Sequence, residues 1–471
     1  MGVTLPCMHE RNLQMKQRSP KLKFAVLLLS LLLCTLLLSS CANLGGLIGT
    51  YVYEQMNEWN GEEVWQRPEE TGPNTKPSTT LPSTTQPPVE TPNHGQNDTP
   101  IQDHITIDGG ADSIALATAK GLRSSVSVYC SFSGSTGGSF YPWGGSSSEE
   151  YYTTGSGVLY QIFADGSAFV VTNHHVVYDS ESNTSNGISE DITLFLYGLE
   201  YEQYAIPATY VGGSVNYDIA ILHVDQNEVL KKAIAKGSAA AVTVGNSNAL
   251  IPGATTVAIG NAAGGGISAT KGIVSVDSEY ITMTANDHSG EVAFRVIRTD
   301  TPVNSGNSGG GLFDTKGNLI GIVNAKIISD DVENIGYAIP SVLVRAVADN
   351  IIDHCYQKDC ETVMRALLGV TVTTSASTTE YDPETGVLQC FEEISVHDVT
   401  AGSLGASILQ KDDIIKSITV DGKTVNITRQ HHLIDAMLDA RVGDAVTMIV
   451  LRDGAEQTVT TTVTSDCLAA Y

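Results

Sequence analysis

Basic residues are scarce in this 471-residue chain, which holds 26 Lys and Arg against 52 Asp and Glu, a formal net charge of −26. Residues 1–40 hold five of the basic residues and one acidic residue. The rest of the chain therefore has 21 basic against 51 acidic residues, a net charge of −30. A body of this sign repels a phosphate backbone, so we expect no nucleic-acid partner.

Long hydrophobic runs are also rare. The run from Phe24 to Leu38 falls short of the ~20 residues of a membrane-spanning helix. Basic residues precede it and Ser39-Ser40-Cys41 follows it, an order typical of an export signal. We predict a signal peptide over residues 1–40, and an uncleaved anchor helix is the alternative. The chain could start at Met1 or at Met15, and Met15 would give a signal of more ordinary length.

Cysteines are few and irregularly spaced. Five lie beyond the signal and Cys41, an odd count that argues against a disulfide framework, and none has the spacing of a zinc site. We therefore expect no metal and no cofactor. Export permits two pairings, Cys355 with Cys360 and Cys390 with Cys467, while buried free thiols are the alternative for these residues and for Cys130.

The segment from Gln66 to about Asp103 consists of Pro, Thr, Ser, Asn and Gln with almost no large apolar residue. Such a composition cannot bury enough surface to offset the entropy of ordering the chain. We therefore predict a disordered tether over residues 41–110.

Short runs rich in β-branched residues recur between glycine-rich turns after residue 111. Many short strands separated by turns indicate a barrel or a sandwich, so the expected fold class is mainly β. The runs form two sets, which predicts two similar β-units. The first set is 157–162, 168–172, 192–196, 204–211 and 219–224, and the second is 255–259, 272–276, 280–284, 293–298, 311–313, 319–325 and 336–338. Helices are expected at 111–123 and 341–368, and a polar, glycine-rich loop at 131–154.

Three motifs beside these runs carry the chemistry. They are His174-His175 after an apolar strand, Asp218 before another, and Ser308 within Gly306-Asn307-Ser308-Gly309-Gly310. A serine hydroxyl becomes a good nucleophile when an imidazole takes its proton and a carboxylate orients that imidazole. The chain order His, Asp, Ser is the order of the chymotrypsin arrangement. The motifs therefore predict a serine protease.

Roles within this set follow from the same chemistry. We assign the general base to His175, with His174 as the alternative, the orienting carboxylate to Asp218 and the nucleophile to Ser308. Glycines around Ser308 let the chain turn sharply and let substrate approach. The backbone N–H groups of Gly306 and Ser308 are expected to hold the oxyanion.

Together, these motifs resemble the HtrA (DegP-like) family of bacterial serine proteases. The matching stretches are 155–158, 172–177, 218–222, 258–261, 306–312, 319–322 and 336–340. The resemblance implies a chymotrypsin-like double β-barrel over residues 111–350, with the triad His175, Asp218 and Ser308. It also implies unfolded protein or peptide substrates and a homotrimer. Separately, Leu38-Ser39-Ser40-Cys41 resembles the lipobox of bacterial lipoproteins, which implies a lipid on Cys41 and membrane attachment outside the cytoplasm.

The last unit, residues 365–471, is similar to a PDZ domain. Leu368, Gly369 and Val370 match its carboxylate-binding loop, where exposed N–H groups hold a peptide terminus. A helix C-cap is the alternative for Gly369. The sequence departs from the family at Lys411-Asp412-Asp413, where glycine usually precedes the aspartate. Expected strands are 370–374, 386–394, 414–420, 445–452 and 458–463, with a helix at 428–440.

The turn before the nucleophile, Thr301 to Ser305, carries no acidic residue, so the specificity pocket should not favour Lys or Arg. The resemblance implies small aliphatic residues on the acyl side of the cut. The expected pocket residues are Asn304, Asn324, Ala325 and Lys326.

The sequence thus predicts a lipid-tethered, ATP-independent serine endopeptidase that acts on unfolded or damaged exported proteins at the cell envelope. A catalytically dormant peptide-binding or chaperone module on the cell surface is the alternative. A sheddase dedicated to one substrate is a third hypothesis.

Overall fold

The computed structural model describes residues 101–102, 111–135, 148–325, 335–358 and 364–470. The predicted signal peptide, Cys41 and Lys326 lie outside these residues. Most of the predicted tether does too. Near its end, β1 (Ile101–Gln102) pairs in parallel with β8 (Val244–Gly245). Backbone pairing orders these two residues in spite of their polar neighbours.

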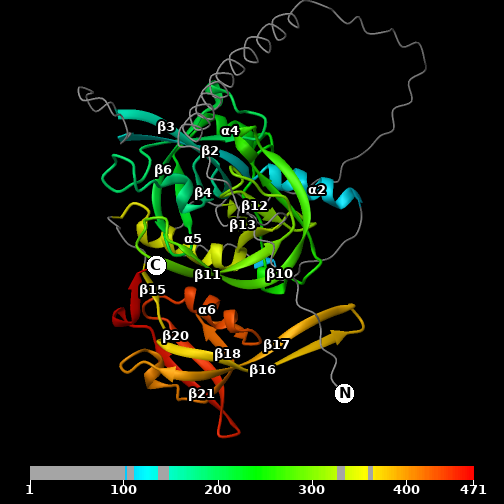
Figure 1. Ribbon diagram of the computed structural model, residues 1–471, viewed down its shortest axis with the longest axis vertical. Helices are drawn as coiled ribbons and strands as arrows, with labels where there is room; N and C mark the ends of the chain where they lie inside the picture. Colours follow the sequence, from blue (N-terminus) through cyan, green and yellow to red (C-terminus); the bar gives the residue numbers. More distant parts are fainter. Residues whose placement is uncertain (1–100, 103–110, 136–147, 326–334, 359–363, 471) are drawn as a thin grey trace, which may run out of the picture. The chain divides into compact units, whose positions relative to one another are not determined.

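The first β-unit is a closed barrel in the order β2-β3-β4-β7-β6-β5 (Figure 1). Its interior is apolar and includes Val128, Leu194 and Leu222. Strand β7 is apolar except for His223 and is buried along its whole length, because α5 packs on the same strand. The strands are β2 (Ser125–Ser135), β3 (Ser148–Ile162), β4 (Ala168–Thr172), β5 (Asp191–Leu196), β6 (Ile206–Ser214) and β7 (Ile219–Val224).

The second β-unit is a sheet in the order β1-β8-β13-β12-β9-β10-β11-β14. A further pairing between β13 and β14 joins the two ends of the path β13-β12-β9-β10-β11-β14, so these strands close on themselves. Two barrels of this kind are the predicted chymotrypsin-like fold, which the structure confirms. The strands are β9 (Thr255–Gly260), β10 (Ser268–Thr284), β11 (Glu291–Thr299), β12 (Gly311–Phe313), β13 (Leu319–Val323) and β14 (Gly336–Pro340).

Along the chain, one helix precedes the strands of the two barrels and another follows them. Helix α2 (Ala111–Leu122) packs on β9, and α5 (Ser341–Cys355) packs on β6, β7 and β13. Helix α5 is shorter than the predicted 341–368, because its C-terminal turn gives way to β15 (Met364–Ala366) before residue 368. Among the described residues, no helix combines the length and the apolar character needed to cross a lipid bilayer.

The C-terminal unit is a β-sheet with one helix against it. Its sheet has the order β16-β17-β18-β20-β21, with β19 (Lys423–Asn426) paired to β18, and its core includes Ile394, Ile418 and Met448. The long β16–β17 hairpin exceeds the predicted strands on both sides of its turn. The other elements are β16 (Val370–Asp382), β17 (Val387–Val399), β18 (Ile414–Val420), α6 (Gln430–Leu438), β20 (Ala445–Arg452), β21 (Ala455–Thr462) and β22 (Leu468–Ala470), which pairs with β15.

The predicted loop over 131–154 is another correction. Strands β2 and β3 pair without interruption from Ser125↔Val158 to Ser135↔Ser148. The rings of Phe132 and Tyr151 stack across this pair, 5.7 Å apart, so aromatic contacts hold a segment whose composition favours a loop.

The structure settles the state of some of the cysteines. Cys390 and Cys467 are free, so of the two alternatives left open for them the free thiols hold, although both residues are only partly buried. Cys130 is a buried free thiol, and burial raises its pKa to about 12. Cys355 is disulfide-bonded, whereas Cys360, its predicted partner, lies outside the described residues.

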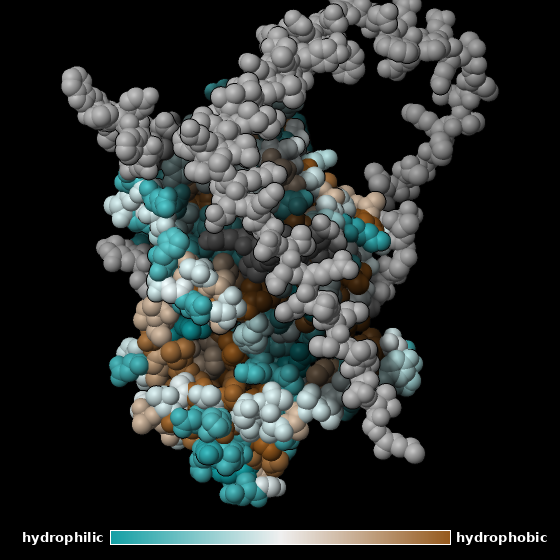
Figure 2. All heavy atoms as spheres, viewed as in Figure 1, coloured by the Kyte–Doolittle hydropathy of each residue, from teal (hydrophilic) through white to brown (hydrophobic). Residues whose placement is uncertain are grey.

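The surface of the described residues is mixed rather than uniformly apolar. Figure 2 shows hydrophilic and hydrophobic residues interleaved on the face in view, with hydrophilic residues gathered at the turn between β20 and β21. Asp453 lies in that turn and Glu456 follows it on β21; both are exposed, in keeping with the acidic composition of the chain.

Candidate active site

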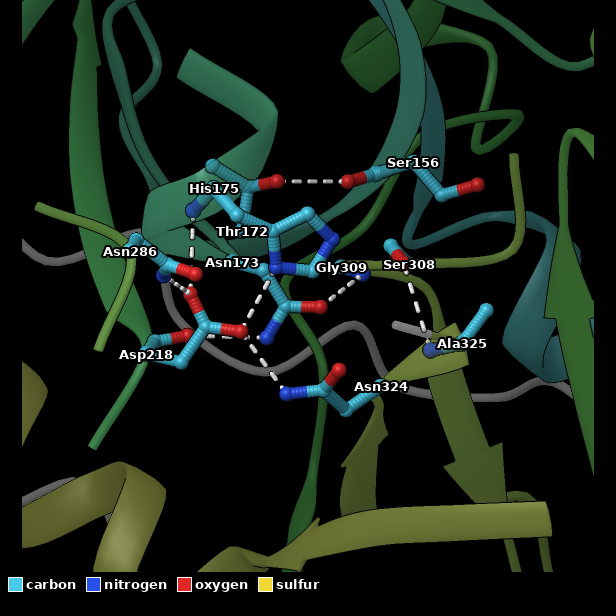
Figure 3. A network of polar contacts seen from close by, with 10 residues as sticks. All are labelled: Ser156, Thr172, Asn173, His175, Asp218, Asn286, Ser308, Gly309, Asn324 and Ala325. Carbon is cyan, nitrogen blue, oxygen red and sulfur yellow. Dashed lines mark hydrogen bonds and ion pairs between the residues drawn. The ribbon is translucent and has the colours of Figure 1, made fainter. Parts of the chain in front are cut away.

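Two neighbouring strands of the first barrel bring His175 and Asp218 together. The short helix α3 (His174–Val177) follows β4, and Asp218 precedes β7. Strands β4 and β7 are antiparallel partners, so the end of one lies beside the start of the other. As a result, the Nδ1 atom of His175 lies 2.6 Å from Oδ2 of Asp218 (Figure 3).

The Asp218 carboxylate is buried, and each of its oxygens accepts two hydrogen bonds. Oδ1 accepts from the backbone N–H of His175 at 2.9 Å and from Nδ2 of Asn286 at 2.7 Å. Oδ2 faces Nδ1 of His175 and accepts from Nδ2 of Asn324 at 2.7 Å. Burial alone would raise the pKa of Asp218, but the charge and hydrogen bonds of His175, with the charge of His174, hold it below its ordinary value. The carboxylate is therefore kept ionised and fixed in orientation.

The backbone of Asp218 is held as tightly as its side chain. Its φ of 51° lies in the left-handed region, which aspartate tolerates better than most residues. Its carbonyl oxygen accepts from Nδ2 of Asn173 at 2.8 Å and from the N–H of His174 at 3.2 Å. Oδ1 of Asn173 accepts from the N–H of Gly309 at 2.7 Å, so Asn173 ties Asp218 to the loop of Ser308.

The two adjacent histidines have different surroundings. The ring of His174 is buried, tilted against Tyr178 at 4.9 Å and edge-on to Tyr210 at 6.4 Å. The His175 side chain is 16% exposed and is the one that meets Asp218. A general base needs both a carboxylate partner and access to substrate, so the geometry favours His175 over His174.

Ser308 lies in the loop between β11 and β12 of the second barrel, and this loop contacts the first barrel. Its carbonyl oxygen accepts from the N–H of Ser156 on β3 at 2.8 Å. Next to it, Gly309 has a φ of 82°, and a Cβ there would lie 2.1 Å from the carbonyl oxygen of Ser156. Only glycine fits this approach of the loop to the first barrel.

The two backbone N–H groups predicted to hold the oxyanion are available to a ligand. Among the described residues, neither the N–H of Gly306 nor that of Ser308 donates a hydrogen bond. The Oγ atom of Ser308 accepts from the N–H of Ala325 at 3.2 Å. In the view of Figure 3 the His175 ring lies between the Asp218 carboxylate and Ser308. No hydrogen bond joins the His175 ring to Ser308 within the described residues.

The residues predicted to form the specificity pocket lie in different surroundings. Asn324 is fully buried, and its Nδ2 atom donates to Oδ2 of Asp218 at 2.7 Å. It directly follows β13 of the second barrel, and from there its amide reaches Asp218 of the first barrel. Ala325 contacts the nucleophile through its N–H. Asn304 is exposed in the turn before Ser308, and Lys326 lies outside the described residues.

The predicted peptide-binding loop lies between β15 and β16. Gly369 has a φ of 71°, and a Cβ there would lie 2.2 Å from Cβ of Ser403. It follows a strand, so the helix C-cap alternative is wrong. The N–H groups of Leu368 and Gly369 donate no hydrogen bond to any described residue, and Val370 begins β16, the edge strand of its sheet.

Sequence reasoning missed the contacts of Asn173, Asn286 and Asn324 with Asp218, although Asn324 was expected in the specificity pocket. Asn173 directly precedes the histidine pair and could have been considered as a candidate. Asn286 and Asn324 lie far from Asp218 in the chain, with no motif to mark them, so only the fold reveals their role.

With this geometry in hand, comparison with known proteins defines the class. A family described as "Trypsin-like peptidase domain" matches residues 155–322. This segment contains His175, Asp218 and Ser308. Residues 155–322 are therefore similar to trypsin-like peptidase domains and hold the three candidate catalytic residues.

The individual proteins to which this chain is similar include HtrA-type proteases. Serine protease Do-like HtrA of Bacillus subtilis (strain 168) is 32% identical over 328 residues, which span 67% of this chain and 65% of that protein. Periplasmic serine endoprotease DegP of Escherichia coli (strain K12) is 33% identical over 213 residues, 45% of this chain and 38% of that protein. A solved structure, the HtrA-type protease AlgW with decapeptide, is 26% identical and covers 74% of this chain and 98% of its own, with a TM-score of 0.46. The chain is thus similar to HtrA-type serine proteases and spans less than two thirds of the Bacillus protein.

Proposed function

We propose that this chain is an ATP-independent serine endopeptidase of the HtrA type that cleaves unfolded or damaged exported proteins at the cell envelope. The observation that carries the proposal is the His175–Asp218 pair, with a buried and fully hydrogen-bonded carboxylate, beside Ser308. Ser308 Oγ attacks the peptide carbonyl, His175 takes its proton, and Asp218 stabilises the imidazolium that forms. The imidazolium then gives this proton to the leaving amine as the C–N bond breaks, and water, activated by His175, releases the acyl group from Ser308. The N–H groups of Gly306 and Ser308 stabilise the oxyanion.

Casein cleavage tests this proposal. Wild-type protein is expected to degrade casein without ATP, and Ser308→Ala is expected to bind casein without cleaving it. Thr284→Ala, an exposed residue of the β10–β11 hairpin, serves as the control for handling and folding. Cleavage of casein by purified Ser308→Ala would overturn the proposal.

A dormant peptide-binding module is a second candidate, and one observation favours it. Ser308 Oγ is hydrogen bonded to Ala325 and not to His175. Catalytic hydrogen bonds often tighten only when substrate binds, so this arrangement also fits a resting protease. Incubation with an excess of unfolded casein separates the two candidates. A protease releases casein fragments, whereas a dormant module prevents aggregation and releases none.

Peptide capture by the C-terminal unit is part of the proposal. The unpaired N–H groups of Leu368 and Gly369 support a site for a C-terminal carboxylate, and the edge of β16 supports strand addition. Gly369→Ala should weaken the binding of a peptide with a free C-terminal carboxylate, measured by fluorescence anisotropy. The same peptide with an amidated C-terminus is the control, and equal binding of both would contradict this assignment.

Membrane attachment through lipid on Cys41, and assembly as a homotrimer, complete the proposal. They are supported by the sequence resemblances and are tested separately from catalysis. Metabolic labelling with a fatty-acid analogue should mark the wild type and not Cys41→Ala. Light scattering of a form that begins after Cys41 should give three times the chain mass.

A further inference from the structure

The hairpin of β10 and β11 ends in a compact, ordered turn. The N–H of Ala285 donates to the carbonyl of Gly290 at 2.8 Å, and the N–H of His288 donates to the carbonyl of Ala285 at 3.0 Å. Within this turn, Oδ1 of Asp287 accepts from the N–H of Ser289 at 2.9 Å. Behind the turn, Met283 packs partly buried against the core. The hairpin therefore presents its tip in one defined position.

From this tip one side chain reaches the catalytic pair. Asn286 is 8% exposed and its Nδ2 atom donates to Oδ1 of Asp218 at 2.7 Å (Figure 3). The two residues belong to different β-units, since Asp218 precedes a strand of the first barrel and Asn286 follows a strand of the second. We propose that Asn286 is a positioning residue of the protease, which holds the Asp218 carboxylate in the plane that His175 requires. This inference rests on the proposed endopeptidase function.

The contact pattern of Asp218 shows what Asn286 contributes. On Oδ1, the other donor is the backbone N–H of His175, whose place is fixed by α3. On Oδ2, the donor besides the His175 ring is Asn324. One amide from the hairpin and one from β13 thus hold opposite oxygens. Loss of either lets the carboxylate rotate, and the Nδ1 atom of His175 then loses its linear partner.

The charges around Asp218 define the expected pH behaviour. The titratable groups that act on it are His175 and His174, and Asp287 on the hairpin acts on His174. Without the Asn286 donor, more negative charge remains on Asp218 towards His175. This charge favours the protonated imidazole, so the acid limb of the pH–kcat profile should move to higher pH.

Two variants and one control test the inference with a chromogenic peptide substrate. Asn286→Ala removes the donor, and Asn286→Asp keeps the shape while placing a second carboxylate against Oδ1. Thr284→Ala, exposed on the same hairpin, is the matched control. Both Asn286 variants should lower kcat about 10- to 100-fold at unchanged KM, as expected for a hydrogen bond to a charged group. Asn286→Asp should show the larger loss and the larger shift of the acid limb, while Thr284→Ala should behave as wild type.

Several outcomes would overturn the inference. Wild-type kcat and pH profile in either folded Asn286 variant would exclude a positioning role. Unfolding of both variants, seen by circular dichroism, would show that Asn286 is structural instead. An inactive wild type would reject the proposed function itself, whereas an active wild type with unaffected variants would reject only the role of Asn286.

Discussion

His175 and Asp218 are joined twice, side chain to side chain at 2.6 Å and backbone N–H to carboxylate at 2.9 Å. The backbone bond fixes the carboxylate relative to α3, and the side-chain bond fixes the imidazole relative to the carboxylate. The pair is therefore aligned before any substrate arrives, and this preorganisation is what the mechanism requires.

Asp218→Asn tests that alignment. An amide at this position donates to Nδ1 of His175 and stabilises the wrong imidazole tautomer, so kcat should fall by on the order of 10⁴. KM should stay near the wild-type value, because Asp218 is buried and cannot contact substrate. Steady-state kinetics with a peptide substrate measures both constants. A loss below tenfold would contradict the role of Asp218.

Asn324→Ala separates the role found in the structure from the role predicted by the sequence. If its amide serves Asp218, kcat should fall about 10- to 100-fold for every substrate, while the preference among Ala, Val and Leu at the cleaved bond stays the same. A library of peptides that differ only at this position measures the preference. A changed preference with kcat retained would return Asn324 to the specificity pocket.

Asp435→Ala should be strongly destabilising. Nη2 of Arg295 on β11 lies 2.7 Å from Oδ2 of Asp435 on α6, and both side chains are buried. Removing the carboxylate leaves a buried, uncompensated guanidinium, which costs about 3–5 kcal/mol of unfolding free energy. Urea denaturation measures the loss.

The double variant Arg295→Met with Asp435→Leu provides the matched control, because it removes both charges. It should recover most of the stability that Asp435→Ala loses. For comparison, Glu228→Gln breaks the exposed pair of Glu228 with Lys231 and should cost less than about 1 kcal/mol. Equal losses from the buried and the exposed pair would contradict the burial argument.

Asp349 should make stability depend on pH. It is buried, accepts from the Tyr160 hydroxyl at 2.6 Å and lies 3.5 Å from Arg345. Burial raises its pKa to about 7, against an ordinary value of 3.8. The unfolded chain therefore releases this proton at lower pH than the folded protein does. The contribution of Asp349 to stability is full below about pH 4 and is lost as pH rises to about 7.

Asp349→Asn removes this dependence. The unfolding free energy of the variant relative to wild type should rise by on the order of a few kcal/mol between about pH 4 and pH 7 and stay constant above. Urea denaturation at several pH values measures the difference. A difference that does not change with pH would show that Asp349 is ionised in the folded protein throughout this range.

Much of the fold could be predicted because its strands are marked by apolar composition. The runs 168–172 and 219–224 coincide with β4 and β7, which are buried along their whole length. The hairpin arms at 131–135 and 148–154 could not be predicted, because their polar residues are held by pairing and not by burial. Asp412 illustrates a related point. It takes a φ of 70°, in the left-handed region that favours glycine, at the position where the resemblance to a PDZ domain leads us to expect glycine.

The reacting groups of the candidate site could be predicted from the sequence, but the amides that orient them could not. His175, Asp218 and Ser308 carry local motifs because each must sit at a strand end or in a glycine-rich turn. The amides that orient Asp218 need only reach it in space. Asn286 and Asn324 come from a turn and a strand end of the other barrel, with nothing in their neighbours to distinguish them from ordinary surface or core amides.

The most direct measurement of the central claim is labelling with a fluorophosphonate probe, followed by mass mapping of the modified residue. The account predicts a single adduct on Ser308 in the wild type, no adduct in Ser308→Ala, and much slower labelling in His175→Ala. Cleavage of casein by wild-type protein whose Ser308 stays unmodified at saturating probe would contradict it.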